Sequence, residues 1–175
     1  LLLNFNRKLI PAIFCCKKKI AIRDNETAGE LHDEMKEIGA DLLLQTIQEL
    51  AQNNLKEIKQ PGVAPLNLNL HHAPKIFTET CEINWQKNVD DIYNLIRGLS
   101  PYPAAFTFLT NKKLKIFNAK KDSSTIQESP GTFITDNKTF LKFACKDGYI
   151  FVTELQLEGK KKMKIEDFLR GWRNN

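Results

Sequence analysis

The chain has 175 residues, 42% of them hydrophobic and 27% charged, which is an ordinary composition for a soluble globular protein with a packed core. It holds no apolar run approaching the roughly 18 residues that a membrane-spanning helix needs, which argues against a membrane protein. The net charge of +5 conceals an asymmetry, because residues 24–109 hold 6 basic and 13 acidic residues while residues 110–175 hold 14 basic and 8 acidic ones. The basic C-terminal region favours a polyanionic partner, although charge of this size is more often only a solvated surface.

Residue types that usually carry chemistry form no recognisable site. The four cysteines fit no metal-ligand spacing, and we expect reduced thiols in a reducing compartment. The sequence shows no Ser–His–Asp order, no glycine-rich phosphate loop and no cluster of metal ligands. It therefore predicts neither a metal nor an internal active site.

The N-terminal segment is expected to be disordered. Residues 1–18 contain no acidic residue and do not follow the order of a signal peptide. Two adjacent cysteines beside three lysines leave a palmitoylated patch open, but a broken or mistranslated end is the favoured interpretation. Residues 19–24, KIAIRD, then read as a short strand.

Residues 27–52 predict a helix. Thr27 and Glu30 have the spacing of a capping box, in which each side chain accepts from the other residue's backbone N–H. Four apolar residues follow at steps of 4, 3 and 4, the spacing of one helix face: Leu31, Met35, Ile38 and Leu42.

A linker and a second helix follow. Residues 53–78 carry no sustained period and three prolines, which is typical of a linker. The second helix is expected to have Asn84 as its N-cap and Gly98 in the left-handed conformation at its end, before Ser100-Pro101 forbids more helix. Its apolar stripe consists of Val89, Ile92, Tyr93, Ile96 and Leu99.

After Pro103 the apolar period changes to two, which indicates strands. Residues 104–121 predict two strands with a turn near Asn111-Lys112, and residues 131–159 predict three more, with turns at Asp136-Asn137 and Asp147-Gly148. A short helix closes the chain. Five closely spaced strands with one helix match a small closed barrel such as the OB fold, so the predicted class is α+β.

Basic residues on these strands are the candidate binding residues. They share strand faces or follow the last strand: Lys113 with Lys115, Lys142 with Lys146, and then Lys160, Lys161, Lys162 and Lys164. Such a face would bind a phosphate backbone by charge and counterion release, without reading sequence. Exposed lysines on an edge strand also prevent aggregation, and both interpretations stay open.

Seven short stretches of the chain occur in a characteristic order. They are ETAGELHDEMKEIGADLLLQTI, APKIF, INW, IRGLSPYPAA, LKIFNAK, PGTF and LQLEGKKKMKIEDFLRG. Together they closely resemble the C-terminal half of methionyl-tRNA formyltransferases, over Lys19–Gly171.

The resemblance implies a two-domain enzyme. In that family an N-terminal Rossmann-like domain takes the formyl group of 10-formyltetrahydrofolate and transfers it to methionine on initiator tRNA, while a C-terminal OB-like barrel holds the tRNA. On that plan, residues 19–52 are the last strand and helix of the Rossmann-like domain. Residues 53–78 are the linker, and residues 79–175 are the OB-like domain. Residues 1–18 do not match the family. The resemblance also implies a monomer in the cytoplasm, or in an organelle matrix in a eukaryote, with initiator methionyl-tRNA as partner and with no metal and no membrane.

The family's catalytic residues do not carry over. They are an Asn and a His in an N-x-H-x-S-L-L-P stretch, expected upstream of this chain, and an Asp in a D-x-G-type loop, expected within residues 1–18, which hold no acid. Asn69 and His71 form an N-x-H triplet but lack the Ser-Leu-Leu-Pro that follows in the family. The resemblance thus implies that this chain has no catalytic residue and no site for 10-formyltetrahydrofolate, and that it does not catalyse formyl transfer alone.

Under this hypothesis the candidate tRNA contacts are basic residues near the domain junction and on the barrel: Lys75, Arg97, Lys113, Lys115, Lys142, Lys160, Lys161 and Lys162. Two alternatives stay open. One is the C-terminal part of a nucleotide-sugar or folate formyltransferase, and the other is a stand-alone, non-catalytic RNA-binding module. The stretches RGLSPYPAA and GKKKM favour the tRNA enzyme.

Overall fold

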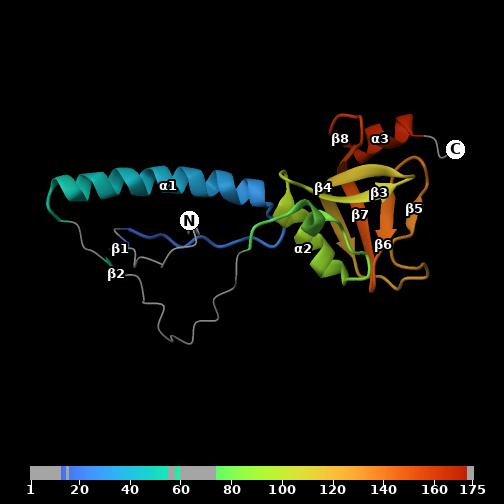
Figure 1. Ribbon diagram of the computed structural model, residues 1–175, viewed down its shortest axis with the longest axis horizontal. Helices are drawn as coiled ribbons and strands as arrows, with labels where there is room; N and C mark the ends of the chain where they lie inside the picture. Colours follow the sequence, from blue (N-terminus) through green and yellow to red (C-terminus); the bar gives the residue numbers. More distant parts are fainter. Residues whose placement is uncertain (1–12, 15, 55–57, 60–73, 173–175) are drawn as a thin grey trace. The chain divides into compact units, whose positions relative to one another are not determined.

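The computed structural model describes residues 13–14, 16–54, 58–59 and 74–172 (Figure 1). The chain divides into two compact units: one comprises residues 1–21 and 33–74, and the other comprises residues 22–32 and 75–175. Asn69, His71 and most of the segments predicted to be disordered or linker lie outside the described residues.

The first unit consists mainly of α1 (Ala28–Ala51), whose first turn belongs to the second unit. The helix predicted for residues 27–52 is confirmed. A short antiparallel pair, β1 (Ile13–Phe14) with β2 (Ile58–Lys59), also lies in this unit. No residue of α1 is buried, and Met35 of its predicted apolar stripe is 52% exposed, so the stripe builds no core among the described residues.

The strand predicted for residues 19–24 is not formed. The backbone of residues 16–23 adopts no regular secondary structure, and a turn follows at Asp24 and Asn25. A strand is held by hydrogen bonds to a neighbouring strand, and none of the described strands pairs with this segment. The prediction of a strand here was therefore wrong.

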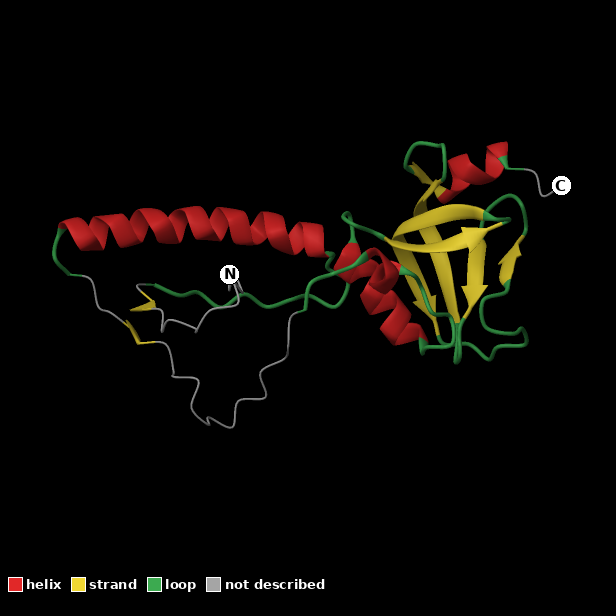
Figure 2. Cartoon of the chain, viewed as in Figure 1, coloured by secondary structure: helices red, strands yellow, loops and turns green. Residues whose placement is uncertain are grey.

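The second unit is built on one antiparallel sheet, whose strands are yellow in Figure 2. The strand order is β3–β4–β7–β6–β5, and β8 pairs with β7. Its strands are β3 (Ala105–Leu109), β4 (Lys112–Asp122), β5 (Phe133–Thr135), β6 (Leu141–Ala144), β7 (Tyr149–Leu157) and β8 (Met163–Lys164). The two strands predicted in residues 104–121 and the three predicted in residues 131–159 are confirmed. The two-residue β8 was not predicted.

The sheet curls but does not close into the predicted barrel. Strands β3 and β5 are its two edges and do not pair with each other, although Phe106 of β3 forms an isolated bridge with Glu82. Closure requires a continuous hydrogen-bonded ladder around the barrel, and this ladder ends at the three-residue β5. The α+β class is confirmed, and the architecture is a half-barrel.

Two helices complete the core on the inner face of the sheet. Helix α2 (Val89–Leu99) packs against β4 and β7, and α3 (Ile165–Gly171) packs against β7 and β8. All five residues of the stripe predicted for α2 are buried. They join fully buried side chains such as Leu114, Phe143 and Phe168 in one hydrophobic cluster.

The ends of α2 differ from the prediction. Asn88, not Asn84, is the N-cap, and the side chain of Asn84 accepts instead from the N–H of Gln86 at 3.0 Å in the preceding turn. Gly98 remains inside the helix without a left-handed φ, and the chain leaves through Ser100 in an extended conformation. The helix ends there because the following proline disfavours a helical residue before it.

The N-terminus of α2 is tied to a distant hairpin. Oδ1 of Asp147 accepts from the N–H of Val89 at 2.7 Å, which satisfies a free helix donor and places a negative charge at the positive end of the helix. Asp147 and Gly148 lie in the tight connection predicted between β6 and β7. A Cβ on Gly148 would lie 2.3 Å from the carbonyl oxygen of Asp122, so this connection requires glycine.

The segment that leads into α1, together with the first turn of that helix, docks on the end of α2 and the chain that leaves it. The N–H of Gly29 donates to the carbonyl of Ser100 at 2.9 Å, and Nη1 of Arg97 donates to the carbonyl of Glu26 at 3.1 Å. Both bonds join segments about 70 residues apart in the sequence. Residues 22–32 thus belong to the same compact unit as the sheet.

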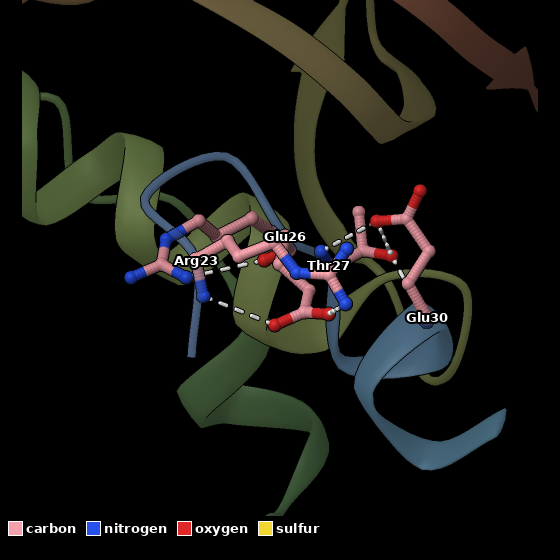
Figure 3. A network of polar contacts seen from close by, with 5 residues as sticks. Arg23, Glu26, Thr27 and Glu30 are labelled. Atoms are coloured by element: carbon pink, nitrogen blue, oxygen red, sulfur yellow. Dashed lines mark hydrogen bonds and ion pairs between the residues drawn. The ribbon is translucent and has the colours of Figure 1, made fainter. Parts of the chain in front are cut away.

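The predicted capping box starts α1 within this segment (Figure 3). The N–H of Thr27 donates to Oε2 of Glu30 at 2.8 Å, and the N–H of Glu30 donates to Oγ1 of Thr27 at 3.3 Å. The Thr27 backbone and hydroxyl donors hold the pKa of Glu30 below its usual value. Beside the box, Arg23 and the buried carboxylate of Glu26 form an ion pair at 3.2 Å.

Gly29 and Gly39 of α1 offer a matched pair of substitutions. A Cβ at Gly29 would lie 2.5 Å from Cδ of the rigid Pro101 ring, whereas a Cβ at Gly39 would meet no atom within 4 Å. We expect Gly29→Ala to lower the free energy of unfolding of the second unit by about 1–3 kcal/mol through overpacking. Gly39→Ala should stabilise the helix by about 0.5–1 kcal/mol, the usual cost of an interior glycine. Urea unfolding followed by tryptophan fluorescence and circular dichroism measures both, and equal effects would contradict the docking.

Candidate nucleic-acid interface

Strand β4 separates the core from a basic surface. Leu114 and Ile116 are fully buried, while Lys113 and Lys115 lie on the opposite face of the strand and are partly exposed, as the alternation predicted. We call the side of the sheet that bears Lys113 and Lys115 the outer face. A β-bulge after Ile116 shifts the alternation by one residue.

One group of basic and aromatic residues lies where β3 pairs with β4. We call it the β3–β4 cluster; it consists of Phe106, Phe108, Lys113 and Lys115. Phe106 is opposite Lys115 and Phe108 is opposite Lys113 in the ladder. Nζ of Lys113 lies 3.6 Å from the centroid of the Phe106 ring, in a cation–π contact. Phe108 meets Phe106 edge to face at 5.9 Å and is 55% exposed.

A second group crosses β4, β7 and β6. We call it the β6–β7 cluster; it consists of Lys120, Phe140, Lys142, Tyr149 and Phe151. Phe151 pairs with Lys120 on one side and with Lys142 on the other, which places the three in a row across the outer face. Nζ of Lys142 lies 3.7 Å from the centroid of Tyr149 and 5.3 Å from that of Phe151. The ring of Phe140 lies 6.0 Å from Phe151.

An acidic side chain borders the β6–β7 cluster. The hydroxyl of Tyr149 donates to Oε2 of Glu128 at 2.5 Å. This bond lowers the pKa of the Glu128 carboxyl and raises the pKa of the Tyr149 phenol, so that the carboxylate is charged and the phenol neutral near pH 7. The nearby ammonium of Lys142 also lowers the pKa of Glu128, although less than the hydrogen bond does.

The lysines after β7 lie in the turn that leads to β8. Lys160 and Lys161 are exposed. Lys162 forms an ion pair with Glu154 of β7 at 2.9 Å, and its Nζ lies 4.7 Å from the Phe117 ring centroid. Of these three predicted contacts, Lys162 therefore has an acidic partner within the protein.

Three other basic residues differ in their surroundings. Lys75 is exposed, with Nζ 5.4 Å from the Phe77 ring centroid. Arg97 bonds Asn94 of its own helix at 2.8 Å as well as the docked segment, so its guanidinium has a structural role. Lys121 is paired with Asp90 of α2, a hydrogen bond that raises the pKa of Lys121, and it lies away from the outer face.

The aromatic members of both clusters were missed at the level of sequence. The sequence pattern predicts strands over Phe106, Phe108 and Phe151 but does not single out these rings. The alternation in AFTFL places two phenylalanines on one strand face, and this pattern was the available signal. The structure places Lys113, Lys115 and Lys142 beside aromatic rings on the outer face.

The described residues contain no group of three or more His, Cys, Asp or Glu side chains that would hold a metal ion. Within the same part of the chain, no helix is both long and apolar enough to cross a membrane. Cys16, Cys81 and Cys145 are free thiols, and burial raises the pKa of Cys145 to about 12. The raised pKa means that the Cys145 thiol is not poised as a nucleophile.

The half-barrel with its flanking helices has a known counterpart among protein families. Residues 75–173, more than half of the chain, match the family described as "Formyl transferase, C-terminal domain". The chain belongs to this family. The match coincides with the sheet, α2 and α3 of the second unit.

Curated relatives are methionyl-tRNA formyltransferases. The chain is 41% identical to that of Phocaeicola vulgatus over 162 residues, which cover 90% of this chain and 50% of the relative. It is 35% identical to that of Clostridium novyi over 154 residues, which cover 88% of this chain and 48% of the relative. The chain therefore spans about half the length of these relatives.

Solved structures share the fold at low sequence identity. HypX from Aquifex aeolicus, in complex with tetrahydrofolic acid, matches with a TM-score of 0.62 at 17% identity, over 89% of this chain and 28% of its own. WlaRD, a sugar 3N-formyl transferase, matches with a TM-score of 0.52 at 22% identity, over 80% of this chain and 47% of its own.

Lys142 and Lys120 allow the cation–π contacts to be tested. Lys142→Met keeps an unbranched side chain of similar length but removes the charge held over Tyr149. We expect it to lower the free energy of unfolding by about 0.5–1 kcal/mol. Lys120→Met, in the same row but on an exposed residue, should change it by less than about 0.5 kcal/mol. Urea unfolding measures the difference, and a larger loss from Lys120→Met would contradict the assignment.

Proposed function

We propose that the second unit is the tRNA-binding part of a methionyl-tRNA formyltransferase, the enzyme that formylates methionyl initiator tRNA with 10-formyltetrahydrofolate. The single observation that supports this most is the outer face, on which lysines alternate with aromatic rings over three neighbouring strands. The identity of the curated relatives supports the same substrate.

The outer face suits a phosphate backbone. Cations held beside rings lose little side-chain freedom when a phosphate binds, and each neutralised phosphate releases counterions. A binding mode of this kind recognises RNA shape and backbone and does not read base sequence. The expected contacts are the predicted lysines, with Lys113, Lys115 and Lys142 at the centre and with Lys75, Arg97, Lys160, Lys161 and Lys162 around them.

We further propose that chemistry is supplied by residues outside this chain. Residues 19–52 would then be the last part of a Rossmann-like formyltransferase domain, which also carries the site for 10-formyltetrahydrofolate. The chain's match to about half the length of its relatives supports this arrangement. The protein would act as a monomer in the cytoplasm and would hold no metal.

Salt dependence tests the tRNA-binding proposal. We expect the affinity for initiator tRNA to fall steeply with salt, and Lys113→Gln combined with Lys142→Gln to reduce the slope of log K against log salt by about 2, roughly 0.9 per lost phosphate contact. The matched control is Lys121→Gln combined with Lys138→Gln, which removes the same charge from residues that belong to neither cluster and should leave the slope unchanged. Lys121 pairs with Asp90 of α2, and Lys138 lies in the exposed turn between β5 and β6. Filter binding between 50 and 200 mM salt measures both. Equal slopes for the two double variants would refute the proposed surface.

An activity assay tests whether the catalytic residues lie outside this chain. The chain alone, given 10-formyltetrahydrofolate and methionyl initiator tRNA, should form no formylmethionyl-tRNA above the blank. The chain joined behind the N-terminal half of the Phocaeicola vulgatus relative should form it, and should not formylate a nucleotide sugar. Turnover by the chain alone would contradict the proposal, and activity of the fusion on the nucleotide sugar would favour the other formyltransferase class.

A further inference from the structure

A hollow of about 550 Å³ lies beside the β3–β4 cluster. It opens between η1 (Thr78–Cys81), the turn at Tyr102 and the outer edge of β3 and β4. All of its lining residues belong to residues 75–115, and hence to the second unit. Its volume falls in the range of small-ligand sites, about 300–1,000 Å³.

Aromatic and apolar side chains form one side of the hollow. Tyr102 is 86% exposed, and Phe77 and Ile76 are each more than half exposed. The Tyr102 turn is fixed at its end, because the N–H of Ala104 donates to the carbonyl of Leu99 at 2.9 Å. A large ring held on a fixed turn and left open to solvent is a stacking surface for a planar group.

Positive charge forms the other side. Lys113 and Lys115 line the hollow, and Nζ of Lys113 is held over the buried ring of Phe106. Lys75 lies at the Phe77 ring, next to the same opening. None of the residues that line the hollow is acidic. The occupant that matches this lining is therefore planar on one side and anionic on the other.

We propose that the hollow takes an unpaired nucleotide of the bound RNA, with its base stacked on Tyr102 and its phosphate at Lys113 and Lys115. Aromatic side chains stack the bases of single strands irrespective of sequence, and neighbouring cations track the phosphates. A base inside an A-form duplex is stacked on its neighbours and cannot enter such a hollow. This inference rests on the proposed tRNA-binding function and adds a site that distinguishes unpaired from paired RNA.

The experiment titrates the full chain with two fluorescein-labelled probes at one low salt concentration. The probes are a single-stranded tetranucleotide RNA and a blunt duplex RNA without unpaired nucleotides, and fluorescence anisotropy reports binding. Tyr102→Ala should weaken binding of the single strand at least about five-fold, because base stacking on an aromatic ring is worth about 1–3 kcal/mol. It should change binding of the duplex less than two-fold. Tyr102→Phe, the matched control, keeps the ring and should bind both probes as the parent does.

The outcomes separate this inference from the proposed function. No loss of single-strand binding in Tyr102→Ala, or an equal loss on both probes, overturns the nucleotide site while leaving lysine-dependent tRNA binding intact. Failure of the parent chain to bind the tetranucleotide also overturns it. If the lysine variants leave tRNA binding unchanged but Tyr102→Ala behaves as expected, the outer-face proposal and the phosphate contact at Lys113 fail, and the stacking of a base on Tyr102 stands. Because the Tyr102 side chain is exposed, an unchanged unfolding curve confirms that its variants remain folded.

Discussion

The pairing of β4 with β7 is the constraint on which the rest of the domain depends. Its register buries Ile116 opposite Leu155 and Ala119 opposite Val152, so that Lys115 before the β-bulge and Lys120 after it must point to the outer face. A slip by one residue would bury the lysines and expose the core. The same apolar contacts that stabilise the sheet therefore determine where its positive charge lies.

Contacts between distant segments connect this sheet to the rest of the second unit. The carboxylate of Asp147 holds the start of α2, and the end of α2 holds residues 22–32 through Ser100 and Arg97. Arg97 shows that a basic residue can serve the fold as well as a binding surface, because its guanidinium donates to a carbonyl within the protein. The docked segment leads into α1, so the bonds to Ser100 and Arg97 also hold the first turn of that helix in the second unit.

Local and periodic features could be predicted from the sequence. The capping box of Thr27, the buried stripe of α2 and the five main strands all follow from spacings within a few residues. Features that depend on distant partners could not. The strand at residues 19–24 has no strand beside it, the sheet stops at β5 without closing, and the N-terminus of α2 is stabilised by a carboxylate 58 positions away in the sequence.

The candidate site likewise combines residues that local spacing predicts with residues that only distant pairing brings together. The lysine face of β4 followed from alternation, but its aromatic partners lie on β3, β6 and β7, and only the ladder registers place them beside the lysines. The hollow at Tyr102 combines residues from η1, a turn and two strands, so no single stretch of sequence indicates it.

The most direct test of the outer-face assignment is to acetylate lysines in the chain with and without saturating initiator tRNA and to quantify each site by mass spectrometry. The account predicts that bound tRNA protects Lys113, Lys115 and Lys142, together with the turn lysines Lys160 and Lys161, while the reactivity of Lys36 and Lys138 is unchanged. Protection spread evenly over all lysines, or confined to those away from the outer face, would contradict it.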